Sequence, residues 1–176
     1  MRVITGKYKG RRFDIPRTFK ARPTTDFAKE NIFNVLREYV DFEECTALDL
    51  FAGTGSISLE FLSRGCTQVV SVEADRDHAR FIRQCMAKIN VQNHVLIQGD
   101  VFKFIRGNAM QFNIIFADPP YALPELPQIP DLVLNSGLLA PDGIFVFEHG
   151  KHNDFSQHPR FIDHRAYGSV NFSLFR

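Results

Sequence analysis

Hydrophobic residues in this chain fall into two kinds of segment. Five short runs are apolar almost throughout, which predicts strands buried on both faces of a parallel sheet. These runs cover residues 46–52, 68–74, 94–99, 112–117 and 143–148. Between them, apolar residues recur every three or four positions, which predicts helices. The helical pattern covers residues 57–62, 79–89, 101–105 and 132–133.

The start of the chain departs from this alternation. Residues 2–15 hold two short β-prone pieces around glycines, which predicts a small hairpin. A helix over about 25–40 follows, with Thr24 or Thr25 as its N-cap. The solvated face of this helix is expected to carry Lys29, Glu30 and Arg37.

The end of the chain departs from it as well. Segments 161–164 and 169–175, joined near Gly168, predict a hairpin that adds an antiparallel strand. The whole pattern predicts an α/β fold of the Rossmann-like kind. It has a mostly parallel sheet, helices on both faces and a small N-terminal β-hairpin.

Composition favours a single compact unit. The chain has 176 residues, of which 44% are hydrophobic and 18 are Phe, enough for a substantial core.

Its apolar runs are shorter than the roughly 18 residues of a membrane span, and its first residues lack the apolar stretch of a signal peptide. We therefore expect a cytoplasmic protein. Cys45, Cys66 and Cys85 show no C-x-x-C spacing, so neither a disulfide framework nor a zinc site is predicted.

Positive charge is concentrated at the N-terminus. Residues 1–22 contain eight basic side chains and one acidic side chain, a net charge of +7, whereas the rest carries 13 basic and 19 acidic ones, a net charge of −6. A basic arm on an acidic body is expected of a protein that binds a phosphate backbone. We divide the chain into this arm, residues 1–22, and one globular domain, residues 23–176. The residues expected to contact phosphates are Arg2, Lys7, Lys9, Arg11, Arg12, Lys20 and Arg22.

A glycine loop follows the first predicted strand. The segment reads Asp49-Leu50-Phe51-Ala52-Gly53-Thr54-Gly55, and a helix is predicted from about Ser56. Ligands of open parallel sheets bind at the carboxyl ends of strands, where glycines allow close approach to the backbone. The dinucleotide fingerprint requires a third glycine where this chain has Ser58, which disfavours NAD. The Asp49 carboxylate would repel a pyrophosphate but attract the sulfonium and amine of S-adenosylmethionine, directly or through water.

Three further strands end in a carboxylate. Glu73 lies 18 residues past Gly55, where it can accept both ribose hydroxyls, and we prefer it to Asp75 for this role. Asp100 is placed to accept from an adenine amine, and Asp118 ends the fourth strand. Because these strand ends share one edge of the sheet, the carboxylates predict a ligand site there.

The fourth strand ends in Asp118-Pro119-Pro120-Tyr121. The prolines lack an N–H and fix φ, which leaves the Pro119 carbonyl directed away from the sheet ladder. Asp118 and this carbonyl can accept both hydrogens of an exocyclic amine, which favours the pyramidal, nucleophilic form of the nitrogen. Tyr121 can stack on the base, a contact worth roughly 1–3 kcal/mol. These residues predict chemistry on a base amine.

Other candidates are weaker. The histidines near the C-terminus lack Cys or acid partners at metal-binding spacing, so we interpret them as exposed loop residues and expect no metal. They are His149, His152, His158 and His164. Ser56 and Ser58 lack the G-x-S-x-G elbow of an acyl-transfer nucleophile.

Together with Arg22-Pro23-Thr24-Thr25-Asp26, the glycine loop and the Asp-Pro-Pro-Tyr motif give the chain a resemblance to a known family. Over essentially its whole length it resembles the RsmD family of bacterial 16S rRNA (guanine-N2)-methyltransferases, which are class I enzymes. The resemblance implies S-adenosylmethionine as cofactor and a seven-stranded sheet with an antiparallel last strand. It also implies methylation of one guanine of 16S rRNA in the small subunit or its assembly intermediate. We expect the protein to act as a monomer.

The resemblance also implies roles for particular residues. Asp118, Pro119, Pro120 and Tyr121 would be catalytic. The cofactor would contact Asp49, Phe51, Ala52, Gly53, Thr54, Gly55, Glu73, Ala74, Asp100, Val101 and Thr24. The proline-rich run after Tyr121 departs from the family, so we expect the loop over the target base to close differently.

Two other functions remain open from the residues alone. A DNA adenine-N6 or cytosine-N4 methyltransferase shares the amine-binding motif, although 176 residues leave little room for a target-recognition region. A non-catalytic RNA-binding or ribosome-assembly module is the other alternative. The presence of Asp49, Glu73 and Asp118 counts against it.

Overall fold

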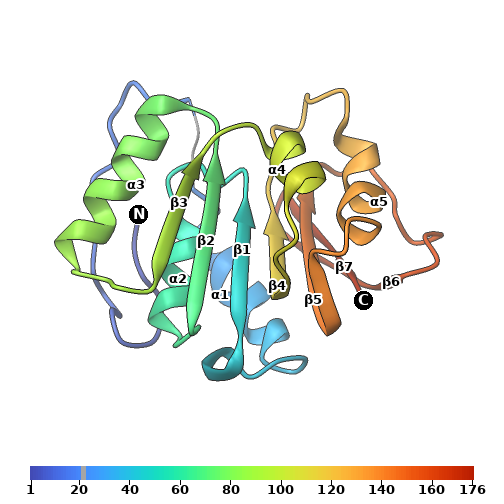
Figure 1. Cartoon of the computed structure of the whole chain (residues 1–176), viewed down its shortest axis with the longest axis horizontal. Helices are drawn as coiled ribbons and strands as arrows, with labels where there is room; N and C mark the ends of the chain where they lie inside the picture. Colours follow the sequence, from blue (N-terminus) through green and yellow to red (C-terminus); the bar gives the residue numbers. More distant parts are fainter. Residues whose placement is uncertain (21–22) are drawn as a thin grey trace.

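The computed structural model describes residues 1–20 and 23–176. It contains one seven-stranded sheet with helices on both faces (Figure 1). The strands are β1 (Thr46–Leu50), β2 (Gln68–Glu73), β3 (His94–Gln98), β4 (Phe112–Ala117), β5 (Leu139–His149), β6 (Phe161–Tyr167) and β7 (Val170–Phe175). The helices are α1 (Asp26–Leu36), α2 (Ser56–Ser63), α3 (Arg76–Lys88), α4 (Val101–Gly107) and α5 (Ile129–Leu134), with short 3-10 helices η1 (Phe42–Glu44) and η2 (Leu126–Gln128).

The strand order creates a switch point beside β1. The order is β3-β2-β1-β4-β5-β7-β6, and β1 pairs in parallel with β2 on one side and β4 on the other. Of the seven strands, β7 alone runs against the others. The predicted mostly parallel sheet with an antiparallel last strand is therefore confirmed. Ligands of such sheets bind outside the carboxyl ends of the strands at the switch point, here between β1 and β4.

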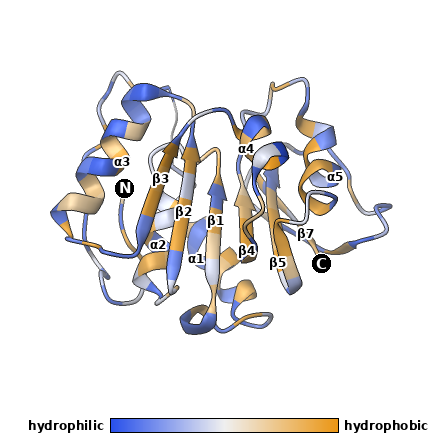
Figure 2. Ribbon diagram, viewed as in Figure 1, coloured by the Kyte–Doolittle hydropathy of each residue, from blue (hydrophilic) through white to orange (hydrophobic). Residues whose placement is uncertain are grey.

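The sheet divides the core into two layers. Along β1, Ala47 belongs to the hydrophobic cluster that includes residues of α1, α2 and α3, whereas Leu48 and Leu50 belong to the cluster of α4 and α5. Figure 2 shows hydrophobic residues along the central strands and a mixture of hydrophobic and hydrophilic residues on α3. Because helices cover both faces, the central strands read as continuous apolar runs in the sequence.

The predicted N-terminal hairpin is present in a reduced form. A single antiparallel bridge joins Arg2 to Arg12. The next amides leave the ladder, because the backbone N–H groups of Ile4 and Thr5 donate to the Glu60 carboxylate at 2.9 and 3.1 Å. A buried acid on α2 thus takes the place of the strand pairing that we predicted.

The first helix is shorter than predicted, and one of its charged residues is buried. It ends at Leu36 rather than near residue 40, and Thr25 is its N-cap. Glu30 and Arg37 are exposed, as predicted. The prediction for Lys29 was wrong: its side chain is 1% exposed, because partners on α2 and in the N-terminal segment surround its ammonium.

The fifth strand is longer than predicted and ends in a buried histidine. It begins at Leu139 and pairs with β4 through a register shift between Phe112 and Ile114. We predicted His149 as an exposed loop residue, which was wrong. This residue is 1% exposed, because β5 continues to it and pairs there with β7. Its Nε2 lies 2.7 Å from the Ser173 hydroxyl oxygen.

Two further features concern the chain as a whole. In the part of the chain that the structure describes, the helices are too short or too polar to cross a membrane. The three cysteines are free and buried. Burial raises the pKa of the Cys66 thiol to about 12, which makes it a poor nucleophile.

Candidate active site

The carboxyl ends of the central strands are joined and border one cleft. The backbone N–H of Asp118, just after β4, donates to the Leu50 carbonyl of β1 at 3.3 Å. In the same way, Ala52 N–H donates to the Val72 carbonyl of β2 at 3.0 Å. The cleft above these ends has a volume of about 1020 Å³. The strand ends therefore hold their side chains at a common edge, as the sequence predicted.

The glycine loop forms the floor of the cleft in a conformation that favours glycine. Gly53 and Gly55 have φ of 59° and 81°, and Gly55 is the N-cap of α2. A Cβ added to Gly55 would lie 3.0 Å from Ile82 Cγ1, so the loop also requires a small residue where it packs on α3. Phe51 has a φ of 58°, which is strained for a bulky residue and costs on the order of 1–3 kcal/mol. Strained backbone of this kind is often found at functional sites.

Asp49 is buried beneath this loop. Its Oδ2 accepts hydrogen bonds from the Ser58 backbone N–H at 3.1 Å and from the Ser58 hydroxyl at 2.6 Å. Burial raises the pKa of Asp49 to about 7, and the hydrogen bonds from Ser58 oppose that shift. The carboxylate is therefore poised to become fully ionised when a cation enters the cleft.

Glu73 lies on the same side of the cleft as Asp49 and is held there by backbone groups. Its Oε1 accepts from the Gly53 N–H and its Oε2 from the Asp75 N–H, both at 2.7 Å. Asp75 is itself occupied as the N-cap of α3, accepting from Asp77 and His78 N–H groups. Glu73 is thus the better placed of the two acids to accept further hydrogen bonds inside the cleft.

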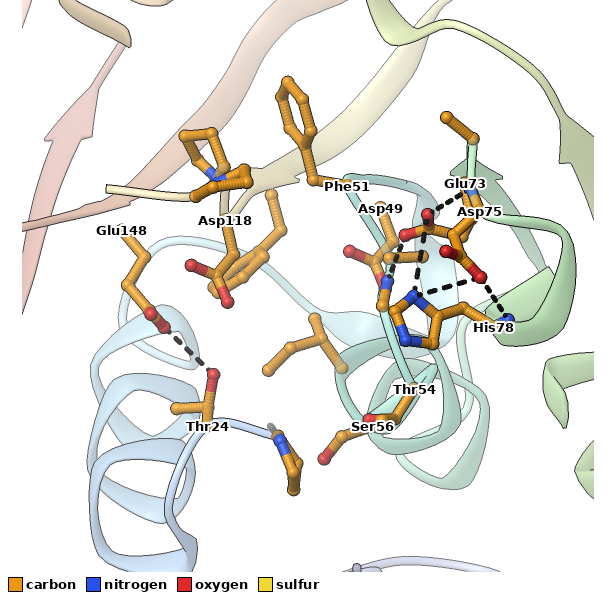
Figure 3. A pocket seen from close by; sticks show the side chains of 18 of the residues that line it. Thr24, Asp49, Phe51, Thr54, Ser56, Glu73, Asp75, His78, Asp118 and Glu148 are labelled. Atoms are coloured by element: carbon orange, nitrogen blue, oxygen red, sulfur yellow. Dashed lines mark hydrogen bonds and ion pairs between the residues drawn. The ribbon is translucent and has the colours of Figure 1, made fainter. Parts of the chain in front are cut away.

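The other side of the cleft carries a pair of carboxyl groups. Burial, followed by the charge of the neighbouring Glu148, raises the pKa of Asp118 well above its ordinary value. Thr24 Oγ1 donates to Glu148 Oε1 at 2.9 Å, and the Tyr121 hydroxyl donates to Oε2 at 3.2 Å. Figure 3 shows Asp118 and Glu148 facing the cleft across from Asp49 and Glu73.

Most residues predicted for the site line this cleft. They are Asp49, Phe51, Ala52, Gly53, Thr54, Glu73, Ala74, Thr24, Asp118, Pro119, Pro120 and Tyr121. Gly55, Asp100 and Val101 do not line it. Asp100 is the N-cap of α4 and accepts from the Lys103 N–H at 2.9 Å, whereas Val101 is buried in the core. Asp100 as an adenine contact stays a prediction.

The residues predicted to contact phosphates differ in whether their side chains bind another part of the protein or are exposed. Arg2 forms an ion pair with Asp26 at 3.0 Å, and the Arg11 guanidinium donates to the Lys88 carbonyl at 3.3 Å. Four others are exposed, namely Lys7, Lys9, Arg12 and Lys20. Lys20 also lines the cleft. Arg22 lies outside the described residues.

Two residues of the site and its surroundings were missed by sequence reasoning. Glu148 ends a predicted strand, as the other acids do, so its position was a usable signal that we did not apply. Lys29 gave no such signal, because its burial depends on Glu60, a residue 31 positions later that lies 3.7 Å from it in space. In the described part of the chain, no group of three or more His, Cys, Asp or Glu residues is arranged to hold a metal ion.

Comparison with known families gives the same picture for the chain as a whole. A family model described as "Conserved hypothetical protein 95" matches residues 1–176. The chain belongs to this family, the RsmD family. The RsmD-family assignment therefore rests on the full length of the chain and agrees with the resemblance stated from its motifs.

Relatives and solved structures support the assignment. Ribosomal RNA small subunit methyltransferase D of Escherichia coli K12 is 30% identical over 148 residues, which are 84% of this chain and 74% of the relative. A solved structure of a hypothetical protein from Thermus thermophilus has a TM-score of 0.87 at 26% identity, covering 100% of this chain and 99% of that one.

A more distant structure confirms the fold class. The 16S rRNA N2 G1207 methyltransferase RsmC of Thermus thermophilus, solved with AdoMet and guanosine, has a TM-score of 0.70 at 18% identity. The match covers 90% of this RsmD-family chain and 45% of the RsmC chain. This likeness concerns the fold alone, and it agrees with the predicted class I methyltransferase architecture.

Proposed function

We propose that this protein transfers a methyl group from S-adenosylmethionine to the exocyclic N2 amine of one guanine in 16S rRNA. The coarser statement, an RsmD-type S-adenosylmethionine-dependent rRNA methyltransferase, follows from its family and relatives. The proposal adds the base, the atom and the residues that act. It also takes the small subunit or an assembly intermediate as the substrate.

The observation that carries the proposal is the pairing of two kinds of subsite in one cleft. One wall bears Asp49 and Glu73 around a glycine loop, and the facing wall bears Asp118 and Glu148. The two prolines after Asp118 line the same cleft, as does Tyr121, whose hydroxyl donates to Glu148. A methyl donor on the first wall and an amine on the second would lie side by side. Holding two reactants in this way is the main source of acceleration for a transfer that needs no prior deprotonation.

The residues of the first wall suit the cofactor. Asp49 offers a carboxylate whose ionisation a cation would favour, and Glu73 offers oxygens already oriented by the Gly53 and Asp75 N–H groups. Ionised Asp49 would attract a positive centre, and Glu73 would accept vicinal hydroxyl groups. When bound, S-adenosylmethionine supplies a methyl group activated on a sulfonium sulfur.

The residues of the second wall suit an aromatic amine. Asp118 and the Pro119 carbonyl accept the two amine hydrogens, which localises the nitrogen lone pair. Tyr121 is 48% exposed, so its ring remains available to stack on the base. After transfer the amine carries an extra proton. The Asp118 carboxylate can accept the proton released.

The N-terminal segment would guide the RNA. Figure 1 shows this segment, in blue, running along the α3 side of the sheet over much of its height. It carries exposed Lys7, Lys9, Arg12 and Arg17 and reaches the cleft at Lys20. Cations along such a path would bind successive phosphates and deliver a base that has left its stack, at a cost of a few kcal/mol.

A transfer assay with three acceptors tests the proposal. Radiolabelled S-adenosylmethionine is incubated with small-subunit particles that lack the modification, with naked 16S rRNA and with duplex DNA. We expect label in ribosomal RNA. Label in DNA alone would contradict the proposal, and cofactor binding without any transfer would favour a non-catalytic assembly module.

A variant separates the two walls. Asp118→Ala should lower transfer by at least about 10²-fold while leaving S-adenosylmethionine affinity nearly unchanged, because the side chain serves the amine. Glu38→Ala, at an exposed position just after α1, is the control for removal of an acid. If Asp118→Ala abolished cofactor binding, the assignment of Asp118 to the amine would be wrong.

A further inference from the structure

Glu148 is a second acid on the base side of the cleft, beside Asp118. It is the penultimate residue of β5 and lies next to the end of β4. The last paired residues of the two strands are Ala117 and Phe147, so Asp118 and Glu148 are the next residues along neighbouring strands. Glu148 is 5% exposed and lines the cleft. Two carboxyl groups thus stand side by side where the base is expected.

The Glu148 carboxyl group is fixed in this position from two directions. Thr24, before α1, donates to one oxygen at 2.9 Å, and the Tyr121 hydroxyl donates to the other at 3.2 Å. Each carboxylate oxygen can accept two hydrogen bonds, so both retain capacity for a ligand. A buried acid that is oriented but not fully satisfied is well suited to recognise a donor.

The bases differ in what they present beside the exocyclic amine. Guanine carries a donor, N1–H, on the ring atom next to the carbon that bears its N2 amine. Adenine and cytosine carry an acceptor lone pair at the corresponding ring position, N1 or N3. A single carboxylate accepts the amine of all three bases, whereas two adjacent carboxylates match only the adjacent donors of guanine. They also place negative charge against the lone pair of the other two bases.

We propose that Glu148 selects guanine by accepting its N1–H while Asp118 accepts a hydrogen of its N2 amine. The inference rests on the proposed function, and it deepens it by assigning the choice of base to a residue outside the Asp-Pro-Pro-Tyr motif. Tyr121 then has two roles, because its ring stacks on the base while its hydroxyl orients Glu148. Thr24 performs the same orienting role from the N-terminal side.

A modified base tests this without changing the protein. After the methylated nucleotide has been mapped, small-subunit particles are reconstituted with 2-aminopurine at that position. This base keeps the N2 amine but lacks O6 and has a lone pair at N1. Wild-type protein should methylate it roughly 10- to 100-fold more slowly than guanine, the size expected for a lost hydrogen bond to a charged group. Rates within about threefold of each other would overturn the inference.

A variant assigns the discrimination to Glu148. In Glu148→Gln the amide N–H can donate to N1 of 2-aminopurine, so the preference for guanine should fall at least tenfold relative to wild type. Glu38→Gln, the same change at an exposed position, should keep the wild-type preference. If Glu148→Gln slowed both substrates equally, Glu148 would be a structural residue and the inference would be wrong.

A variant that does not fold, and a failure of the proposed function itself, can each be told apart from a failure of the role of Glu148. If Glu148→Gln does not fold, wild-type protein is compared on guanine and 1-deazaguanine, which keeps O6 and the N2 amine but replaces N1–H by C–H. Slower transfer to 1-deazaguanine supports the inference, and equal rates overturn it. Wild-type protein that methylates no guanine in the particles would overturn the proposed function itself, and with it the role of Glu148.

Discussion

At the scale of single residues, Asp49 is deeply buried, and this burial disfavours its ionised form when no ligand occupies the cleft. It is 1% exposed, and its pKa is raised to about 7 by desolvation. In the unfolded chain the pKa of this carboxyl group is about 3.9. Between these two values the folded state retains a proton that the unfolded state has lost. The free energy of unfolding therefore decreases as the pH rises through this window.

Asp49→Asn should remove this pH dependence. The amide oxygen can still accept from Ser58, so the ligand-free variant should be more stable than wild type at about pH 8, by up to about 4 kcal/mol, with little difference near about pH 4. Urea unfolding at several pH values measures this. A difference between the two proteins that does not change with pH would show that Asp49 is ionised in the free protein.

The same residue should make cofactor affinity depend on pH. A cation favours ionised Asp49, so S-adenosylmethionine should bind wild type more tightly at about pH 8 than at about pH 6. Asp49→Asn should bind it more weakly and lose this trend. Calorimetric titration of both proteins tests the sign, and tighter binding at the lower pH would contradict it.

Residue by residue, the sequence is informative where local position decides the role. Asp49 and Glu73 lie near the carboxyl ends of predicted strands, Asp118 directly follows one, and the structure places all three in one cleft. The burial of Lys29 could not be predicted, because the helical pattern of the sequence is compatible with an exposed side chain at this position. Its burial depends on Glu60, which is distant in the chain. Contacts between residues distant in the chain leave no periodic signal.

At the scale of elements, Glu60 of α2 joins the N-terminal segment to the domain. Its side chain is fully buried, and it accepts from the Ile4 and Thr5 N–H groups and from the Arg64 guanidinium at 2.9 Å. Lys29 adds its ammonium at 3.7 Å and also donates to Ser56, which lines the cleft. Burial lowers the pKa of Lys29 against the raising effect of Glu60.

Glu60→Gln should loosen this junction. One amide oxygen cannot replace two carboxylate oxygens, and the buried Lys29 would lose its counter-charge, which costs roughly 3–5 kcal/mol. We expect lower stability in urea and faster hydrogen exchange at the Ile4 and Thr5 amides. Glu38→Gln is the matched control. Unchanged exchange at both amides would mean that other contacts hold the segment.

The elements themselves were predicted more accurately than their ends. The five central strands and the terminal hairpin appear where the apolar runs lie. The N-terminal hairpin was predicted from local β-propensity, but its pairing is diverted by Glu60, and β5 extends beyond its apolar run because β4 and β7 pair with it. Tertiary hydrogen bonds determine such boundaries, and the local pattern does not contain them.

At the scale of the molecule, charge is separated between the N-terminal segment and the rest. If the segment binds phosphates, RNA affinity should fall steeply with salt, and each contact should contribute about 0.7–0.9 to the slope of log affinity against log salt. Lys9→Ala with Arg12→Ala removes two exposed cations. We expect the slope to decrease by about 1.4–1.8, measured by filter binding to 16S rRNA.

The control removes the same charge from the opposite face of the sheet. Lys103→Ala with Arg106→Ala changes two exposed cations on α4, far from the N-terminal segment. This pair should leave the slope unchanged. Equal effects of the two double variants would mean that net charge, and not the N-terminal segment, governs RNA binding.

The proposed function depends first on methylation of guanine at N2. The most direct measurement is the identity of the labelled nucleoside after wild-type protein and S-adenosylmethionine have acted on unmodified small-subunit particles. Complete digestion followed by chromatography and mass spectrometry should give N2-methylguanosine as the labelled product, and Asp118→Ala should give at least about 10²-fold less of it. Label in N6-methyladenosine or N4-methylcytidine, with none in N2-methylguanosine, would show that the protein methylates a different base and that the proposed function is wrong.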